Sequence, residues 1–178
     1  STPQGLLIKT DSNGNSEWTQ EYGNPNGRDM LYSVYVLEDG YVANGETNSF
    51  SSGSNQIQDI FTIRVDNSGN SLWQKGFGNG TFENGEDNTL EYSFGANAVY
   101  SDGSYIFSAG TRLDQANSVY RGVFYRYDMN GTLLNSVSNN THSDVYSIHP
   151  GNGYIMTGGL ASGQSAWPSG TGVIHSFK

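Results

Sequence analysis

The 178-residue chain contains no cysteine, and this absence excludes several kinds of chemistry. Without thiols the protein can form no disulfide bond, use no thiolate nucleophile and bind no metal ion through cysteine. Charged residues are also scarce, at 14% of the chain, and only 8 residues are lysine or arginine. The formal charge of −9 repels phosphate backbones and anionic lipids, so neither nucleic-acid nor membrane-surface binding is expected. No apolar run reaches the length of about 18 residues that a membrane-spanning helix needs.

Glycine and aromatic residues are plentiful instead. The chain has 24 glycines, and 13% of its residues are aromatic against 34% that are apolar in all. Its polarity comes from Asn, Ser and Thr rather than from charge, which is typical of turn-rich β proteins and not of charged disordered segments. Residues 1–178 are expected to form one domain.

One short sequence pattern occurs several times along the chain. KTDSNGNSEW at residues 9–18 returns as RVDNSGNSLW at residues 64–73. A third copy, VFYRYDMNGTLL at residues 123–134, carries Asp128 and Gly131 at the same places, and a fourth begins with GVIHSFK at residue 172. The position of Trp18 and Trp73 is expected to be filled in the third copy by Leu133 or Leu134.

A second repeated unit lies between these copies. YSVYVLEDGYVANGET at residues 32–47 is echoed by ANAVYSDGSYIFSAGT at residues 96–111 and by YSIHPGNGYIMTGGL at residues 146–160. Each copy predicts two short strands around a glycine turn, because tight hairpin turns require positive φ. Four antiparallel strands therefore form one period, with repeats at about residues 6–59, 60–121 and 122–171 and a fourth from residue 172.

A period of about 50 to 60 residues with four antiparallel strands predicts an all-β fold of the β-propeller type, with about three blade equivalents. The alternation of IKxDxxGNxxW with YSVxxxxDGYxxxG also resembles the propeller repeats of secreted and cell-surface bacterial and archaeal proteins. The resemblance implies that the YSVYVLED-like strand is innermost in each blade and the SEWTQEY-like strand outermost. The chain would then hold two outer strands, two complete blades and three strands of another. Such an arc, part of a larger propeller, implies association with the remainder of a longer polypeptide or with further copies of the chain.

The repeated aspartates and tryptophans are expected to be structural. Asp11, Asp66 and Asp128 are predicted to cap their own turns through side-chain hydrogen bonds, and Trp18 and Trp73 to pack. A calcium site is the alternative for the first copy, because Asp11, Asn13 and Asn15 with Glu17 offer oxygens at every second position. Ser16 stands where a calcium loop requires glycine, so we expect no cofactor, with calcium as the exception to test.

Signatures of catalysis are missing from the sequence. It contains no Gly-x-Ser-x-Gly motif, and its glycine pairs fail the dinucleotide-binding pattern. His142, His149 and His175 lack the spacing of paired zinc ligands. We therefore expect that the protein is not an enzyme.

Irregular lengths are confined to one set of connections. The tight turns lie at one end of the strands in every sheet, and the variable connections lie at the opposite end. This arrangement predicts a binding face at the end with the variable connections. These connections lie at residues 48–59, 78–93, 112–121 and 161–171, with shorter ones near Asn24 and Asn139. The binding candidates on this face are the aromatic residues Phe50, Phe82 and Trp167 and the acidic residues Glu83, Glu86, Asp87 and Glu91.

Trp167 is placed to stack on a sugar or a partner chain, or to fold back over the edge of its sheet. The four acidic residues could hold calcium or a basic partner, or could form a solvated loop. Asn79, Asn130 and Asn139 begin N-glycosylation sequons.

The leading functional hypothesis is a non-enzymatic structural or adhesive propeller module, extracellular or at the cell surface. A carbohydrate-binding lectin is the alternative, and a polysaccharide-degrading enzyme with a carboxylate pair is the third hypothesis.

Overall fold

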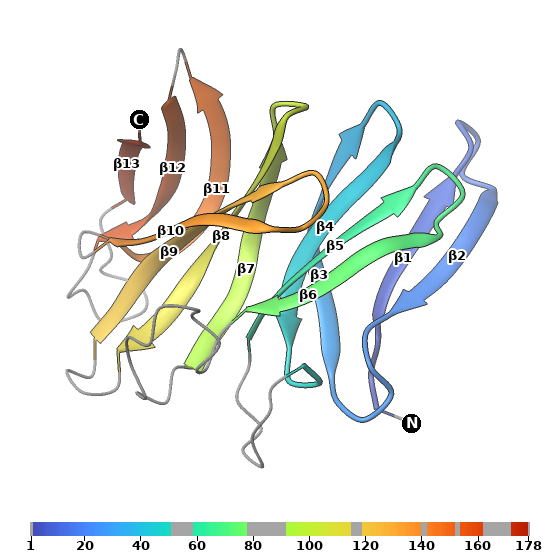
Figure 1. Ribbon diagram of the computed structural model, residues 1–178, viewed down its shortest axis with the longest axis horizontal. Helices are drawn as coiled ribbons and strands as arrows, with labels where there is room; N and C mark the ends of the chain where they lie inside the picture. Colours follow the sequence, from blue (N-terminus) through green and yellow to red (C-terminus); the bar gives the residue numbers. More distant parts are fainter. Residues whose placement is uncertain are drawn as a thin grey trace.

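The computed structural model describes residues 2–50, 59–77, 92–114, 119–139, 142–151, 154–161 and 172–177 (Figure 1). In these residues the chain forms strands and no helix, so the predicted all-β class is confirmed. No helix of the described residues is long and apolar enough to span a membrane. The strands are β1 (Gly5–Thr10), β2 (Ser16–Tyr22), β3 (Asp29–Leu37), β4 (Gly40–Thr47), β5 (Asp59–Asp66), β6 (Ser71–Phe77), β7 (Tyr92–Ser101), β8 (Tyr105–Asp114), β9 (Val119–Asp128), β10 (Leu133–Asn139), β11 (His142–Gly151), β12 (Tyr154–Ala161) and β13 (Gly172–Phe177).

The described strands form four antiparallel sheets. Sheet 1 is β1-β2, sheet 2 is β3-β4-β5-β6, sheet 3 is β7-β8-β9-β10, and sheet 4 is β11-β12-β13. This grouping into two, four, four and three strands matches the one that the resemblance implied. Figure 1 shows the sheets side by side, from sheet 1 in blue to sheet 4 in red. The described strands do not close into a ring or barrel.

The two middle strands of sheet 2, β4 and β5, are covered on both faces by the neighbouring sheets. Because side chains alternate along a strand, Val42 and Ile60 pack toward sheet 3, whereas Ala43, Phe61 and Ile63 pack toward sheet 1. All five side chains are fully buried.

Sheet 3 repeats this arrangement. Val99, Ile106 and Val123 pack toward sheet 2, and Ala98 and Ala109 join side chains of β11 on the other face. The first strands of successive sheets are also neighbours, since the rings of Tyr35 on β3 and Tyr100 on β7 meet edge to face at 5.2 Å. The stacked sheets therefore share a chain of interfaces rather than one central core.

We call the hairpins β1-β2, β5-β6 and β9-β10 the outer hairpins, and their last strands the outer strands. Their register corrects one expectation from the sequence. Trp18 lies opposite Lys9, Trp73 opposite Arg64, and Asn135 opposite Arg126. The prediction that Leu133 or Leu134 occupies the tryptophan position is therefore wrong. Each outer strand carries a β-bulge directly before the tryptophan position, and in β10 the unpaired bulge residue is Leu134.

Candidate interaction surface

Each outer hairpin turn is held by its own aspartate. In the second copy, Oδ1 of Asp66 accepts the backbone N–H groups of Ser68 at 2.9 Å and Asn70 at 2.8 Å. Its Oδ2 accepts a hydrogen bond from Nδ2 of Asn70 at 2.9 Å. The side chain of Asn70, together with these backbone donors, lowers the pKa of the Asp66 carboxyl group. Gly69 completes the turn with φ of +83°, a conformation that other residues rarely adopt.

The other two copies build the same turn. Asp11 accepts the N–H groups of Asn13 and Asn15 together with Nδ2 of Asn15, and Asp128 accepts the N–H groups of Asn130 and Thr132. The glycines of these turns, Gly14 and Gly131, have φ of +86° and +81°. The predicted capping role of the three aspartates is confirmed.

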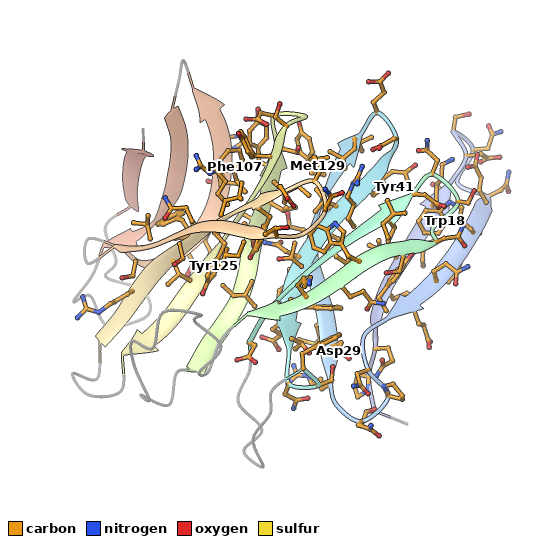
Figure 2. The ribbon with its side chains drawn as sticks, viewed as in Figure 1. Trp18, Asp29, Tyr41, Phe107, Tyr125 and Met129 are labelled. Atoms are coloured by element: carbon orange, nitrogen blue, oxygen red, sulfur yellow. The ribbon has the colours of Figure 1, made fainter. Side chains whose placement is uncertain are left out.

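The tryptophans of the outer strands β2 and β6 each pack on the turn of the following sheet. Trp18 of sheet 1 lies over Gly69 of sheet 2, so closely that a Cβ added to Gly69 would lie 3.0 Å from the ring. Its Nε1 donates a hydrogen bond to the Asn67 carbonyl at 3.1 Å. The ring also meets Tyr41 edge to face at 5.8 Å (Figure 2). Trp18 therefore joins two sheets, as its predicted packing role requires.

Sheets 2 and 3 are joined in the same way. Trp73 lies over Gly131, where an added Cβ would come within 2.8 Å of the ring, and its Nε1 donates to the Met129 carbonyl at 3.0 Å. Arg64 donates a second hydrogen bond to that carbonyl and pairs with Asp39 at 2.6 Å. We call this contact, an indole over a turn glycine with its N–H on the carbonyl that follows the capping aspartate, the tryptophan clasp.

The first turn has the same shape as the two turns that lie under tryptophans, but no indole of the described residues lies over it. In the part of the chain that the structure describes, nothing lies within 4 Å of the position that a Cβ on Gly14 would occupy. On β1, Leu6 and Ile8 are 47% and 56% exposed. Their repeat equivalents on β5, Phe61 and Ile63, are completely buried. We call Leu6 and Ile8 the outer row.

A second uncovered row lies on β3. Val34 and Val36 are 55% and 67% exposed, although their equivalents on β7 by strand register, Val99 and Ser101, are buried. Val99 packs against sheet 2. Sheet 1 consists of two strands and leaves this part of sheet 2 open. Among the described residues, β1 pairs only with β2, so its other edge offers free backbone groups as well.

The opposite end of sheet 2 holds buried polar residues that the sequence reasoning missed. Asp29 on β3 accepts hydrogen bonds from Oγ1 of Thr47, from Oγ of Ser49 at 2.6 Å and from the backbone N–H of Asn24 at 3.0 Å. These bonds fasten the connection between β2 and β3 to the end of the sheet (Figure 2). Both Asp29 and Thr47 are fully buried.

Asp59 lies in the same row of the sheet, because Thr47 pairs with Asp29 on one side and with Asp59 on the other. It is only 3% exposed, and its Oδ1 has no hydrogen-bond partner in the part of the chain that the structure describes. Burial raises the pKa of its carboxyl group to about 6. In the sequence, the only sign of these buried carboxyl groups is that Asp29 and Asp59 each stand at the start of a strand. Acidic residues at strand ends are common, so this sign does not predict burial.

The predicted loop residues are placed only in part. Phe50 stacks on Phe61 with ring centroids 5.4 Å apart and remains 39% exposed, so it folds back over sheet 2. Asn130 is exposed in the turn between β9 and β10, and Asn139 is the last residue of β10. The remaining candidates lie outside the described residues: Phe82, Glu83, Glu86, Asp87, Glu91, Trp167 and the sequon residue Asn79.

For calcium, we expect titration calorimetry to show no micromolar site in the first turn. Both carboxylate oxygens of Asp11 accept hydrogen bonds from Asn15, and the side-chain amide of Asn15 presents its nitrogen to Asp11. Ion binding would have to break this cap. Micromolar binding that Asp11→Ala abolishes and Asp128→Ala retains would contradict the prediction. Residues 2–50, 59–77 and the later described strands contain no cluster of three or more His, Cys, Asp or Glu side chains placed to hold a metal ion.

Comparison with known proteins adds no relative: no family model matches the chain, and no curated protein is significantly similar to it. The observations that bear on its role are therefore the two tryptophan clasps, the open first turn and the two uncovered rows.

Proposed function

We propose that this chain is a non-enzymatic structural or adhesive module of propeller-like blades that acts by packing against other β-sheets outside the cell or on its surface. The observation that carries the proposal is the repeated join between sheets. Each join uses a buried apolar interface and a tryptophan clasp, and one half of such a join is open on sheet 1. A surface that matches buried interfaces within the same chain is suited to bind a β-sheet partner.

The propeller-like arrangement is supported by the order of the sheets. Successive four-stranded units stack face to face, and their first strands, β3 and β7, contact one another as inner strands of adjacent blades would. The extracellular or surface location is supported by the sequence resemblance and by the scarcity of charged residues. Partners are the remainder of a longer polypeptide or further copies of the chain.

Light scattering on the isolated chain tests the proposal. We expect an apparent mass above 19.3 kDa that rises with concentration, because the outer row, the β3 row and the free edge of β1 are exposed. Exchanging both outer-row residues, Leu6→Glu with Ile8→Glu, should return the mass toward that of a monomer.

The matched control is Leu72→Glu with Val137→Glu, which adds the same charge at exposed positions on other strands, 51% and 43% exposed. It should leave the apparent mass unchanged. A chain that stays monomeric at every concentration would contradict the proposal, as would an equal effect of the two double variants.

A further inference from the structure

The three outer turns are equivalent in detail, but only two are occupied. Their capping aspartates make matching hydrogen bonds, and their glycines have φ within a few degrees of each other, from +81° to +86°. Gly69 and Gly131 each lie under an indole, whereas none of the described residues lies over Gly14. The first turn is thus a preformed acceptor, since its geometry does not depend on an indole being present.

From this equivalence we propose that the turn at residues 11–15, with the outer row beside it, binds the outermost strand of a further four-stranded sheet of the same repeat, through a tryptophan at the position of Trp18 and Trp73. The inference rests on the proposed function and names its partner. The indole lies on Gly14, and its N–H donates to the carbonyl of Ser12, which follows Asp11 as Asn67 follows Asp66.

The outer row supports the same occupant. At the occupied join between sheets 1 and 2, Phe61 and Ile63 are buried by side chains of sheet 1 that include Leu7 and Tyr22. Tyr22 also donates its hydroxyl to the Gly69 carbonyl at 2.7 Å, beside the clasp. Leu6 and Ile8 stand at the positions of Phe61 and Ile63, so a sheet that delivers an indole to Gly14 covers them at the same time.

A second copy of this chain can cover the apolar outer row but cannot supply the indole. Its Trp18 and Trp73 are already clasped to its own turns, and the equivalent position in β10 is Asn135. No outer strand among the described residues of a copy has a free tryptophan to offer. The occupant that delivers the indole is therefore a sheet of the same repeat whose outermost strand carries a free tryptophan.

The test uses a chimera that places residues 29–118 in front of Thr2 of the full chain. By the repeat register, Val119 and Thr2 are equivalent, so β1 follows the copied β8 as β9 follows β8. The copied sheet 2 then offers its Trp73 to Gly14. Hydrogen exchange should slow at least about tenfold for β1 amides that point away from β2, and for the turn at residues 11–15.

A mutant cycle identifies the tryptophan. In the 178-residue chain, Gly14→Val should lower the urea midpoint less than Gly69→Val does, because no ring lies over Gly14. In the chimera, Gly14→Val should accelerate exchange across the first turn more than it does in the 178-residue chain. Replacing the copied Trp73 by Ala should remove that extra effect.

Equal effects of Gly14→Val in both proteins would overturn the proposal, as would an unchanged exchange rate in β1 or a chimera that fails to fold.

A separate measurement needs no chimera. N-acetyltryptophanamide at about 10 mM should shift the amide resonance of Gly14 and leave that of Gly69 in place. Equal shifts at the two glycines would also overturn it. Light scattering on the 178-residue chain, by contrast, bears on the proposed function alone.

Discussion

Gly69→Val is expected to lower the free energy of unfolding by about 3 kcal/mol or more, and Gly14→Val by about 1–2 kcal/mol. Both glycines have φ above +80°, where a β-branched residue is strained by about 1–2 kcal/mol. Only at Gly69 does the new side chain also meet the Trp18 ring. Displacing that ring exposes apolar surface and breaks its hydrogen bond to the Asn67 carbonyl, which is worth about 1 kcal/mol.

Urea unfolding followed by circular dichroism and by tryptophan fluorescence measures both variants. The fluorescence of Trp18 should shift toward longer wavelength in Gly69→Val and stay unchanged in Gly14→Val, because only the first substitution displaces an indole. Gly131→Val, under Trp73, should resemble Gly69→Val. Equal losses at Gly14 and Gly69 would show that the clasp contributes nothing, and an unchanged midpoint in all three would refute the role of positive φ.

Asp59→Asn is expected to stabilise the protein by up to about 3 kcal/mol near pH 8 and by little near pH 4. Burial raises the pKa of Asp59 from 3.8 to about 6, so the folded state holds this proton more tightly than the unfolded state does. Stability is therefore highest below about pH 3.8 with respect to this group, and it falls as the pH rises toward 6. The neutral amide of asparagine removes the cost of burying a charge.

Unfolding curves between about pH 4.5 and pH 8 isolate this effect, because the turn aspartates act in the opposite sense. The pKa values of Asp11, Asp66 and Asp128 are lowered, so their contribution is lost only as the pH falls below the range of a normal carboxyl group. The difference between the wild type and Asp59→Asn should grow with pH and level off above about pH 6. A difference independent of pH would contradict the assignment.

Asp29→Asn is the matched control, since Asp29 lies in the same cross-strand row. Its carboxylate accepts hydrogen bonds from Thr47, Ser49 and the N–H of Asn24, and an amide can replace only part of this set. We expect this variant to be less stable than the wild type at both ends of the pH range. One row of a sheet thus contains one aspartate that stabilises the fold and one that destabilises it above pH 6.

Local sequence was sufficient to predict the hairpins and their turns. The capping bonds of Asp11, Asp66 and Asp128 reach no further than four residues, and the glycine that follows three positions later provides the required positive φ. The grouping of the strands into sheets followed from the resemblance to propeller repeats, because the repeats alone do not say which strand begins a sheet. Counting from each turn glycine would also have identified Asn135 in place of Leu133 or Leu134, since the bulge occurs in all three copies.

The sequence by itself therefore determined the all-β class, the antiparallel pairing and the turn chemistry, which depend on contacts between residues close together in the chain. Only the tertiary structure decided what the repeated tryptophans do, because Trp18 and Trp73 bind carbonyls 49 and 56 residues away. The same holds for the burial of Asp59 and for the exposure of Leu6, Ile8, Val34 and Val36. Identical positions in a repeat acquire different solvent exposure according to which sheet lies beside them, and that neighbour is not encoded in the local pattern.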